Sequence, residues 1–168
     1  MKKITKIFTL LFIIITVSAC SNVSEDNGVD MSKYNTKDFS LVECTRDAVT
    51  EDDSSVDIKY KVYYDKDEYI QIILSTQKVT STDSSVLDQY EEAYNNVYSV
   101  YDDLDYYDNV VTRDEDSVTT KTYINYGKVD MDKLMEIEGT DNNVEVTDGK
   151  IKLSDWKNFA KKYGTSCK

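Results

Sequence analysis

Apolar and polar residues alternate with a period of two in the first half of the chain. This pattern is typical of a strand that buries one face in a sheet. Residues 57–64 show it most clearly, and residues 39–46 and 69–80 are rich in β-branched residues. A polar run, Asp65-Lys66-Asp67, separates two of these segments. The sequence therefore predicts three strands joined as an antiparallel meander, with a turn at residues 65–67.

After residue 83 the spacing of apolar residues changes to three and four. Spacings of this kind place apolar side chains on one face of an amphipathic helix. A helix is therefore predicted from Val86, with Asp83 or Ser84 as its N-cap. Its apolar positions are Tyr90, Ala93, Tyr94, Val97, Tyr98, Tyr101 and Leu104.

The last third of the chain combines both patterns. Residues 107–112 and 118–126 predict a hairpin that is closed by the acidic turn Asp114-Glu115-Asp116. A short helix is predicted over residues 131–136, capped by Asp130. A terminal helix is predicted over residues 155–163, capped by Ser154 and ended by Gly164. The fold class is therefore α+β: an antiparallel sheet, meander plus hairpin, with the long helix and the C-terminal helix packed on one face.

The N-terminal residues have the pattern of an export signal. Lysines precede an apolar stretch of eleven residues, Ile7–Val17, which is shorter than the roughly 20 residues that span a bilayer. The following Val17-Ser18-Ala19-Cys20 resembles the bacterial lipobox. The resemblance implies that a diacylglyceryl group is attached to the Cys20 thiol and that the chain is cleaved before it. The alternative is a plain secretory signal followed by a chance cysteine.

Three segments follow from this interpretation. Residues 1–19 are the signal peptide, residues 20–38 are the lipidated cysteine with a flexible polar tether, and residues 39–168 form a single α+β domain. The tether has few apolar residues that could pack against a core. The predicted location is the extracytoplasmic face of the cell membrane, where the lipid on Cys20 makes the membrane a partner.

Two cysteines remain once Cys20 is assigned to the anchor. In an exported protein this even remainder predicts a disulfide between Cys44 and Cys167. Two free thiols in a reducing host are the alternative. A catalytic cysteine is disfavoured, because no histidine is available to lower the thiol pKa.

Charge excludes several classes of function. The net charge is −12, and it becomes −15 once residues 1–19, with three lysines and no acid, are removed. Such a charge repels phosphate backbones and anionic lipid, so a nucleic-acid partner is not expected. The absence of histidine excludes Ser-His-Asp triads and histidine-ligated metal sites. No cofactor motif is present either, and the chain is not expected to be an enzyme.

Charge is also unevenly distributed along the chain. Residues 83–116 carry a net charge of −10, whereas residues 149–168 carry +5. The terminal helix is expected to lie near the acidic long helix, or else to present a basic face to an anionic partner.

Two features are candidates for ligand binding. The acidic runs could bind calcium, although none has the spacing of an EF-hand loop, and solvated turns are the simpler interpretation. Four tyrosines at helical spacing could line a carbohydrate or peptide groove, or could instead belong to the core with their hydroxyls at the surface. These tyrosines are Tyr90, Tyr94, Tyr98 and Tyr101.

A longer pattern is similar to a known family. The meander and long helix are followed by a hairpin end and then by a glycine and a lysine-rich terminal helix. This order, over residues 40–168, resembles the YehR-type small bacterial lipoproteins. The hairpin end reads Ile124-Asn125-Tyr126-Gly127-Lys128-Val129-Asp130-Met131-Asp132-Lys133-Leu134. The resemblance implies an exported, lipid-anchored domain and assigns no catalytic residue.

The sequence favours a lipid-anchored, extracytoplasmic lipoprotein with a non-catalytic domain that binds a small ligand or another envelope component. The alternative is a surface module that responds to a divalent cation such as calcium.

Overall fold

The computed structural model describes residues 25–26, 28–51, 54–139 and 144–168. Residues 1–19, Cys20 and the start of the predicted tether lie outside these ranges. The described part of the chain contains no helix long and apolar enough to cross a membrane.

A six-stranded antiparallel sheet forms the centre of the molecule, in the order β10-β3-β4-β5-β7-β6. The predicted meander and hairpin are confirmed and become neighbours where β5 pairs with β7. A short edge strand, β10, was not predicted. The strands are β3 (Ser40–Glu51), β4 (Ser54–Tyr64), β5 (Ile70–Ser81), β6 (Tyr107–Arg113), β7 (Ser117–Asn125) and β10 (Thr165–Cys167).

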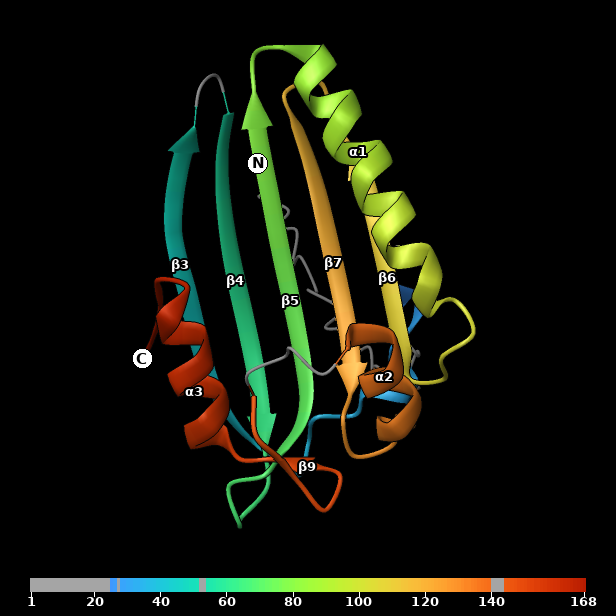
Figure 1. Ribbon diagram of the computed structural model, residues 1–168, viewed down its shortest axis with the longest axis vertical. Helices are drawn as coiled ribbons and strands as arrows, with labels where there is room; N and C mark the ends of the chain where they lie inside the picture. The colour runs from blue at the N-terminus through green and yellow to red at the C-terminus, as the bar shows by residue number, and fades with distance from the viewer. Residues whose placement is uncertain (1–24, 27, 52–53, 140–143) are drawn as a thin grey trace, which may run out of the picture.

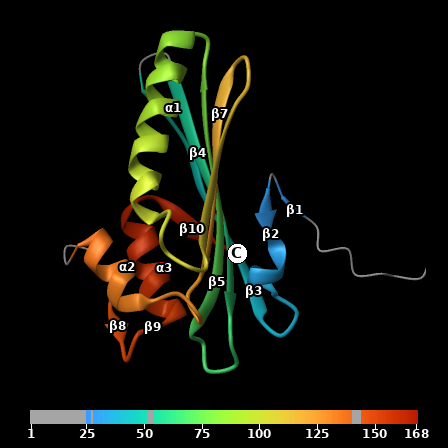
Figure 2. The same ribbon diagram turned by 90° about the vertical axis from the view of Figure 1, so that its right-hand side faces the viewer.

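Three helices lie on one face of this sheet, as predicted (Figures 1 and 2). They are α1 (Ser84–Tyr98), which continues as the 3-10 turn η2 (Ser99–Tyr101), α2 (Met131–Glu138) and α3 (Leu153–Lys162). The hairpin of β8 (Val146–Thr147) and β9 (Lys150–Ile151) connects α2 to α3. The α+β fold class is therefore confirmed.

Two of the predicted helix caps are confirmed and one is wrong. Asp83 accepts a hydrogen bond from the backbone N–H of Ser85, and Asp130 accepts one from Lys133. Ser154 does not cap α3, because the helix already begins at Leu153, with Lys152 as its N-cap. The backbone N–H of Leu153 instead donates to the carbonyl of Glu68 in the β4–β5 turn.

The acidic and basic helices cover different halves of the sheet. Helix α1 packs along β5, β7 and β6, whereas α3 lies over β3 and β4 (Figure 1). No ion pair among the described residues joins a lysine of α3 to an acid of α1. The expectation that the terminal helix neighbours the long helix is therefore wrong, because each helix buries its own apolar face on a separate part of the sheet.

The helix-covered face holds most of the core. Leu87 of α1 is fully buried against Val79 and Val118, which fixes the upper half of that helix to β5 and β7. A larger cluster joins α3 to β3, β4 and β5, and its members are Val42, Cys44, Val62, Ile70, Ile73, Ile151, Leu153, Trp156 and Ala160.

The opposite face of the sheet is partly covered by residues that the sequence assigns to a flexible tether. Strand β2 (Val29–Asp30) pairs with β1 (Glu25–Asp26) and leads into the 3-10 turn η1 (Met31–Tyr34), on the side away from the helices (Figure 2). Val29 and Tyr34 are 5% and 3% exposed and pack with Ile72 and Tyr123 of the sheet.

Polar contacts also bind this N-terminal segment to the sheet. The Tyr34 hydroxyl donates to Oδ2 of Asp108 at 2.6 Å, and Nδ2 of Asn125 donates to the carbonyl of Lys33 at 2.7 Å. The tether prediction is therefore wrong for residues 29–34. Few apolar residues suffice here, because the sheet itself supplies the rest of the buried surface.

The predicted disulfide between Cys44 and Cys167 is present, 123 residues apart in the chain. The two residues are directly opposite each other in the β3–β10 pairing. Gly164, which adopts a positive φ of 79°, ends α3 as predicted and reverses the chain into β10. The disulfide therefore fastens the C-terminal strand to the edge of the sheet.

Candidate functional site

A hollow of about 290 Å³ opens where α3 meets the edge of the sheet. We call it the Arg46 hollow. Aromatic rings dominate its walls, while Arg46 and Thr165 contribute polar groups. Its lining residues are Arg46, Tyr60, Trp156, Phe159, Ala160, Tyr163 and Thr165. An apolar, concave surface with a few polar groups is the usual form of a small-molecule site.

Helix α3 supplies the aromatic wall because of its sequence pattern. Trp156, Phe159 and Tyr163 recur at spacings of three and four, which places them on one face. Trp156 packs edge-to-face on Tyr60 of β4, with ring centroids 5.3 Å apart. Phe159 and Tyr163 pack on each other at 5.0 Å, and Tyr163 stays 57% exposed at the rim. The hollow is therefore built on a helix and a central strand, which are rigid supports.

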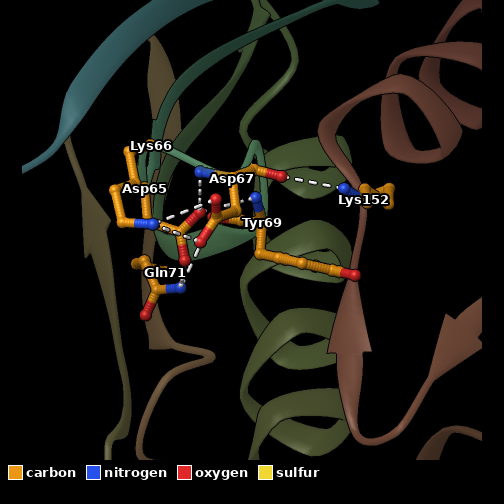
Figure 3. A network of polar contacts seen from close by, with 6 residues as sticks. All are labelled: Asp65, Lys66, Asp67, Tyr69, Gln71 and Lys152. Carbon is orange, nitrogen blue, oxygen red and sulfur yellow. Dashed lines mark hydrogen bonds and ion pairs between the residues drawn. The ribbon is translucent and has the colours of Figure 1, made fainter.

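A polar network at the β4–β5 turn fixes the start of α3 (Figure 3). One carboxylate oxygen of Asp65 accepts the backbone N–H groups of Asp67 and Tyr69, each at 2.9 Å. The other carboxylate oxygen accepts a hydrogen bond from Nε2 of Gln71 at 2.8 Å. These bonds hold the turn in one conformation.

Lys152 connects this turn to the helix. Its Nζ donates to the carbonyl of Asp67 at 2.8 Å and lies 4.0 Å from the centre of the Tyr69 ring. Because Lys152 directly precedes α3, these contacts hold the first turn of the helix and hence Trp156. This network positions the wall of the hollow and does not touch its interior.

Arg46 is the chemically distinctive residue of the hollow. Its Nε is buried and has no hydrogen-bond partner. No ion pair among the described residues includes it, although the chain has 32 acidic residues. A buried donor without a partner costs free energy, so a ligand that supplies an acceptor relieves that cost.

Two tyrosine hydroxyls lie within the electrostatic reach of Arg46. Burial raises the pKa of the Tyr60 hydroxyl, and the positive charge of Arg46 opposes that rise. Burial, with smaller effects of Tyr98 and Tyr90, raises the pKa of Tyr94 to about 12, and Arg46 again opposes the rise. Both phenols therefore keep their protons at neutral pH and can donate hydrogen bonds.

The tyrosines of the long helix pack against the sheet and are all half-buried. Tyr90 and Tyr94 contact the core around Leu87, whereas Tyr98 and Tyr101 contact the cluster around Leu104. Of these four tyrosines, Tyr94 has a pKa that the charge of Arg46 affects. Its hydroxyl accepts a hydrogen bond from Nε2 of Gln77 at 2.6 Å. Their packing corresponds to the core interpretation, and a binding role for the four stays a prediction.

The predicted apolar stripe on this helix is too wide. Val97 is 57% exposed and Ala93 is also exposed. The second half of the helix slants toward the edge strand β6 (Figure 1). In this half Tyr94 and Tyr98 are half-buried, whereas Ala93 and Val97 are exposed.

A second hollow of about 200 Å³ shares the wall of Trp156 and Phe159. It lies between α2, the β8–β9 hairpin and α3. Apart from Glu138 and the hydroxyl of Tyr126, its lining is apolar: Met131, Leu134, Met135, Val144, Val146 and Ile151 complete it. Its position beside the Arg46 hollow offers space for the apolar part of a ligand held at Arg46.

The acidic runs do not form a metal site in the described part of the chain. No group of three histidine, cysteine, aspartate or glutamate side chains there is arranged to hold a metal ion. No described feature therefore favours the calcium alternative. Asp52 and Asp53, in one of the runs, lie outside the described residues.

Arg46 was not predicted as a site residue, although the strand pattern contains a signal for it. Val42, Cys44 and Arg46 are alternate residues of β3, and the first two are buried on the helix-covered face. An arginine that continues an inward-facing alternation is a charged side chain directed at the core. Charged side chains are seldom fully buried unless they are paired, and Arg46 is half-buried on this face with no ion-pair partner among the described residues.

Comparisons with known proteins concern the fold. No protein-family model and no curated protein sequence matches the chain. The fold defines the chain as an α+β domain with helices on one face of an antiparallel sheet. Among solved structures, the structure of the Escherichia coli protein YehR is similar to it, with a TM-score of 0.52 and 15% sequence identity. The match covers 77% of this chain and 91% of YehR. The chain therefore has a YehR-like fold.

A protein from Streptococcus pneumoniae TIGR4 also matches, with a TM-score of 0.45 and 15% identity over 99% of both chains.

Proposed function

We propose that the chain is a distant relative of YehR and an exported lipoprotein, whose domain binds a small organic carboxylate in the Arg46 hollow without catalysing a reaction. The observation that carries the binding role is the buried Nε of Arg46, which has no partner in an aromatic hollow. A carboxylate matches a guanidinium in charge and in planar geometry.

The aromatic walls define the rest of the ligand. Trp156, Tyr60 and Phe159 offer flat apolar surface around the guanidinium. An apolar body attached to the carboxylate gains from burial against these rings. The polar groups that the described residues contribute to the lining include those of Arg46, Thr165 and the two tyrosines, which are suited to holding a ligand by hydrogen bonds.

Phenylacetate is the probe for this site, and phenylacetamide is its neutral counterpart. We expect phenylacetate to bind at least about tenfold more tightly, because a hydrogen bond to a charged group contributes about 1.5–3 kcal/mol. Trp156 is the one tryptophan in the chain and lines the hollow, so its fluorescence reports occupancy directly.

Two variants control this titration. Arg46→Gln is expected to abolish the preference for the carboxylate. Arg113→Gln removes an arginine that already lies beside Asp88 and Glu91, and is expected to leave the preference unchanged. Equal affinity of the wild-type protein for the two probes contradicts the proposal.

The lipid anchor rests on the lipobox-like residues before Cys20, and the disulfide of the structure is compatible with an oxidising compartment. Cys20→Ala is expected to abolish lipid attachment, so that the protein leaves the membrane fraction or keeps its signal peptide. Fractionation and intact-mass measurement test this, with Cys167→Ala as the variant that retains Cys20. Unchanged membrane retention and mass in Cys20→Ala contradict the anchor.

A further inference from the structure

A third hollow, of about 230 Å³, lies on the face of the sheet that the helices leave uncovered. Three lysines from two strands line it, and we call it the lysine hollow. Lys59 of β4 and Lys121 of β7 flank Thr76 of β5 in one cross-strand row, and Lys61 is the next residue of β4 on the same face. Leu74 and Tyr123 form its apolar floor.

This positive patch faces away from α1, the helix that carries Asp88, Glu91 and Glu92 and lies on the other face of the sheet (Figure 2). On the lysine face, Asp108 of β6 bonds to Lys33 and Tyr34 of the N-terminal segment, and Glu43 of β3 lies opposite Lys61 in the β3–β4 pairing. Lys59 and Lys61 are exposed. Because charges in physiological salt are screened over about 8 Å, these lysines act locally despite the net charge of the chain.

The N-terminal segment leads to this same face. Among the residues whose burial is described, Val29 is the first that is buried, and it packs against the sheet close to the lysine hollow, whose lining includes Met31. Nine residues separate Cys20 from Val29. Fully extended, nine residues span about 30 Å, so a lipid on Cys20 keeps this face within that distance of the bilayer.

We infer that the lysine hollow docks against the bilayer and that its lysines bind the phosphate groups of anionic lipid headgroups. This inference rests on the anchor at Cys20 of the proposed function. The lysine face then lies toward the membrane, while the helices and the Arg46 hollow lie toward the solvent, where a ligand has access.

The orientation is tested on vesicles with the anchor supplied chemically. The chain from Cys20 onward contains every described element, and its free Cys20 thiol is coupled to a maleimide lipid. The vesicles contain phosphatidylcholine alone or equal parts of phosphatidylcholine and phosphatidylglycerol. Brief acetylation followed by mass spectrometry then measures the reactivity of each lysine.

Lys59 and Lys61 are expected to react roughly fivefold more slowly on the anionic vesicles, the factor that corresponds to the attraction of one lysine to an anionic surface. High salt is expected to remove this protection. Lys161 and Lys162 of α3, which are exposed on the other face, are expected to react equally on both vesicles.

Matched variants locate the effect. Lys59→Gln/Lys61→Gln is expected to remove the protection of Lys121, and Lys161→Gln/Lys162→Gln is expected to retain it. Equal rates on both vesicles, or equal protection of α3, overturn the inference. Protection by inorganic phosphate on neutral vesicles to the same degree also overturns it, since the hollow then binds free phosphate rather than the bilayer. A failure of lipidation in cells appears in the Cys20→Ala experiment and leaves this result unaffected.

Discussion

Reduction of the Cys44–Cys167 disulfide is expected to lower the free energy of unfolding by about 5 kcal/mol. The bond closes a loop of 123 residues, and in the chain-entropy model a loop of that size stabilises by about 5 kcal/mol. It also holds the short strand β10 on β3. Urea unfolding of the oxidised and reduced protein measures the difference.

The double variant Cys44→Ala/Cys167→Ala is the control for this measurement. It is expected to unfold at the lower urea concentration whether or not reductant is present. If reductant leaves the midpoint of the wild-type protein unchanged, the two cysteines are free thiols, and the assignment to an oxidising compartment loses its structural support.

Tyr34→Ala is expected to destabilise the domain by about 3 kcal/mol, the cost of removing a buried aromatic ring. Tyr34 is 3% exposed, packs at 5.6 Å from the ring of Tyr123 and donates to Asp108. This loss of stability is expected because residues 29–34 pack against the sheet as part of the domain. If they were a flexible tether, the substitution would have no effect on unfolding.

Tyr163→Ala is the matched control, because this tyrosine is 57% exposed. Its loss is expected to change the free energy of unfolding by less than about 0.5 kcal/mol. Equal effects of the two substitutions in thermal or urea unfolding contradict the docked position of the N-terminal segment.

The sequence predicts the elements that bury a regular face. The period of two locates β3, β4 and β5 to within a few residues at most ends, because these strands cover a core on one side. The period of three and four locates α1 and α3 for the same reason. Local cap chemistry is equally readable at Asp83 and Asp130, where the carboxylate bonds to its own helix.

Elements that depend on distant partners were not predictable in the same way. Strand β10 has three residues, Thr165–Cys167, and exists because it pairs with β3. The turn at Met31–Tyr34 is held in place because it packs against Ile72 and Tyr123 of the sheet. Ser154 satisfies the pattern of a cap, but a bond from Leu153 to the β4–β5 turn starts the helix one residue earlier.

The candidate site shows the same division. The aromatic face of α3 is evident from the spacing of Trp156, Phe159 and Tyr163. Its meeting with Arg46 is not, because 110 residues separate Arg46 from Trp156 in the chain. The spacing of the tyrosines of the long helix is evident from the sequence. In the structure these side chains are partly buried against the core.

The proposed carboxylate site depends most on the buried Nε–H of Arg46, which proton–nitrogen NMR observes directly. On addition of phenylacetate, this signal is expected to shift to saturation together with the indole N–H of Trp156, and neither is expected to shift with phenylacetamide at the same concentration. A signal of Arg46 that stays unchanged while phenylacetate binds elsewhere, or that responds equally to both compounds, contradicts a carboxylate site in the Arg46 hollow.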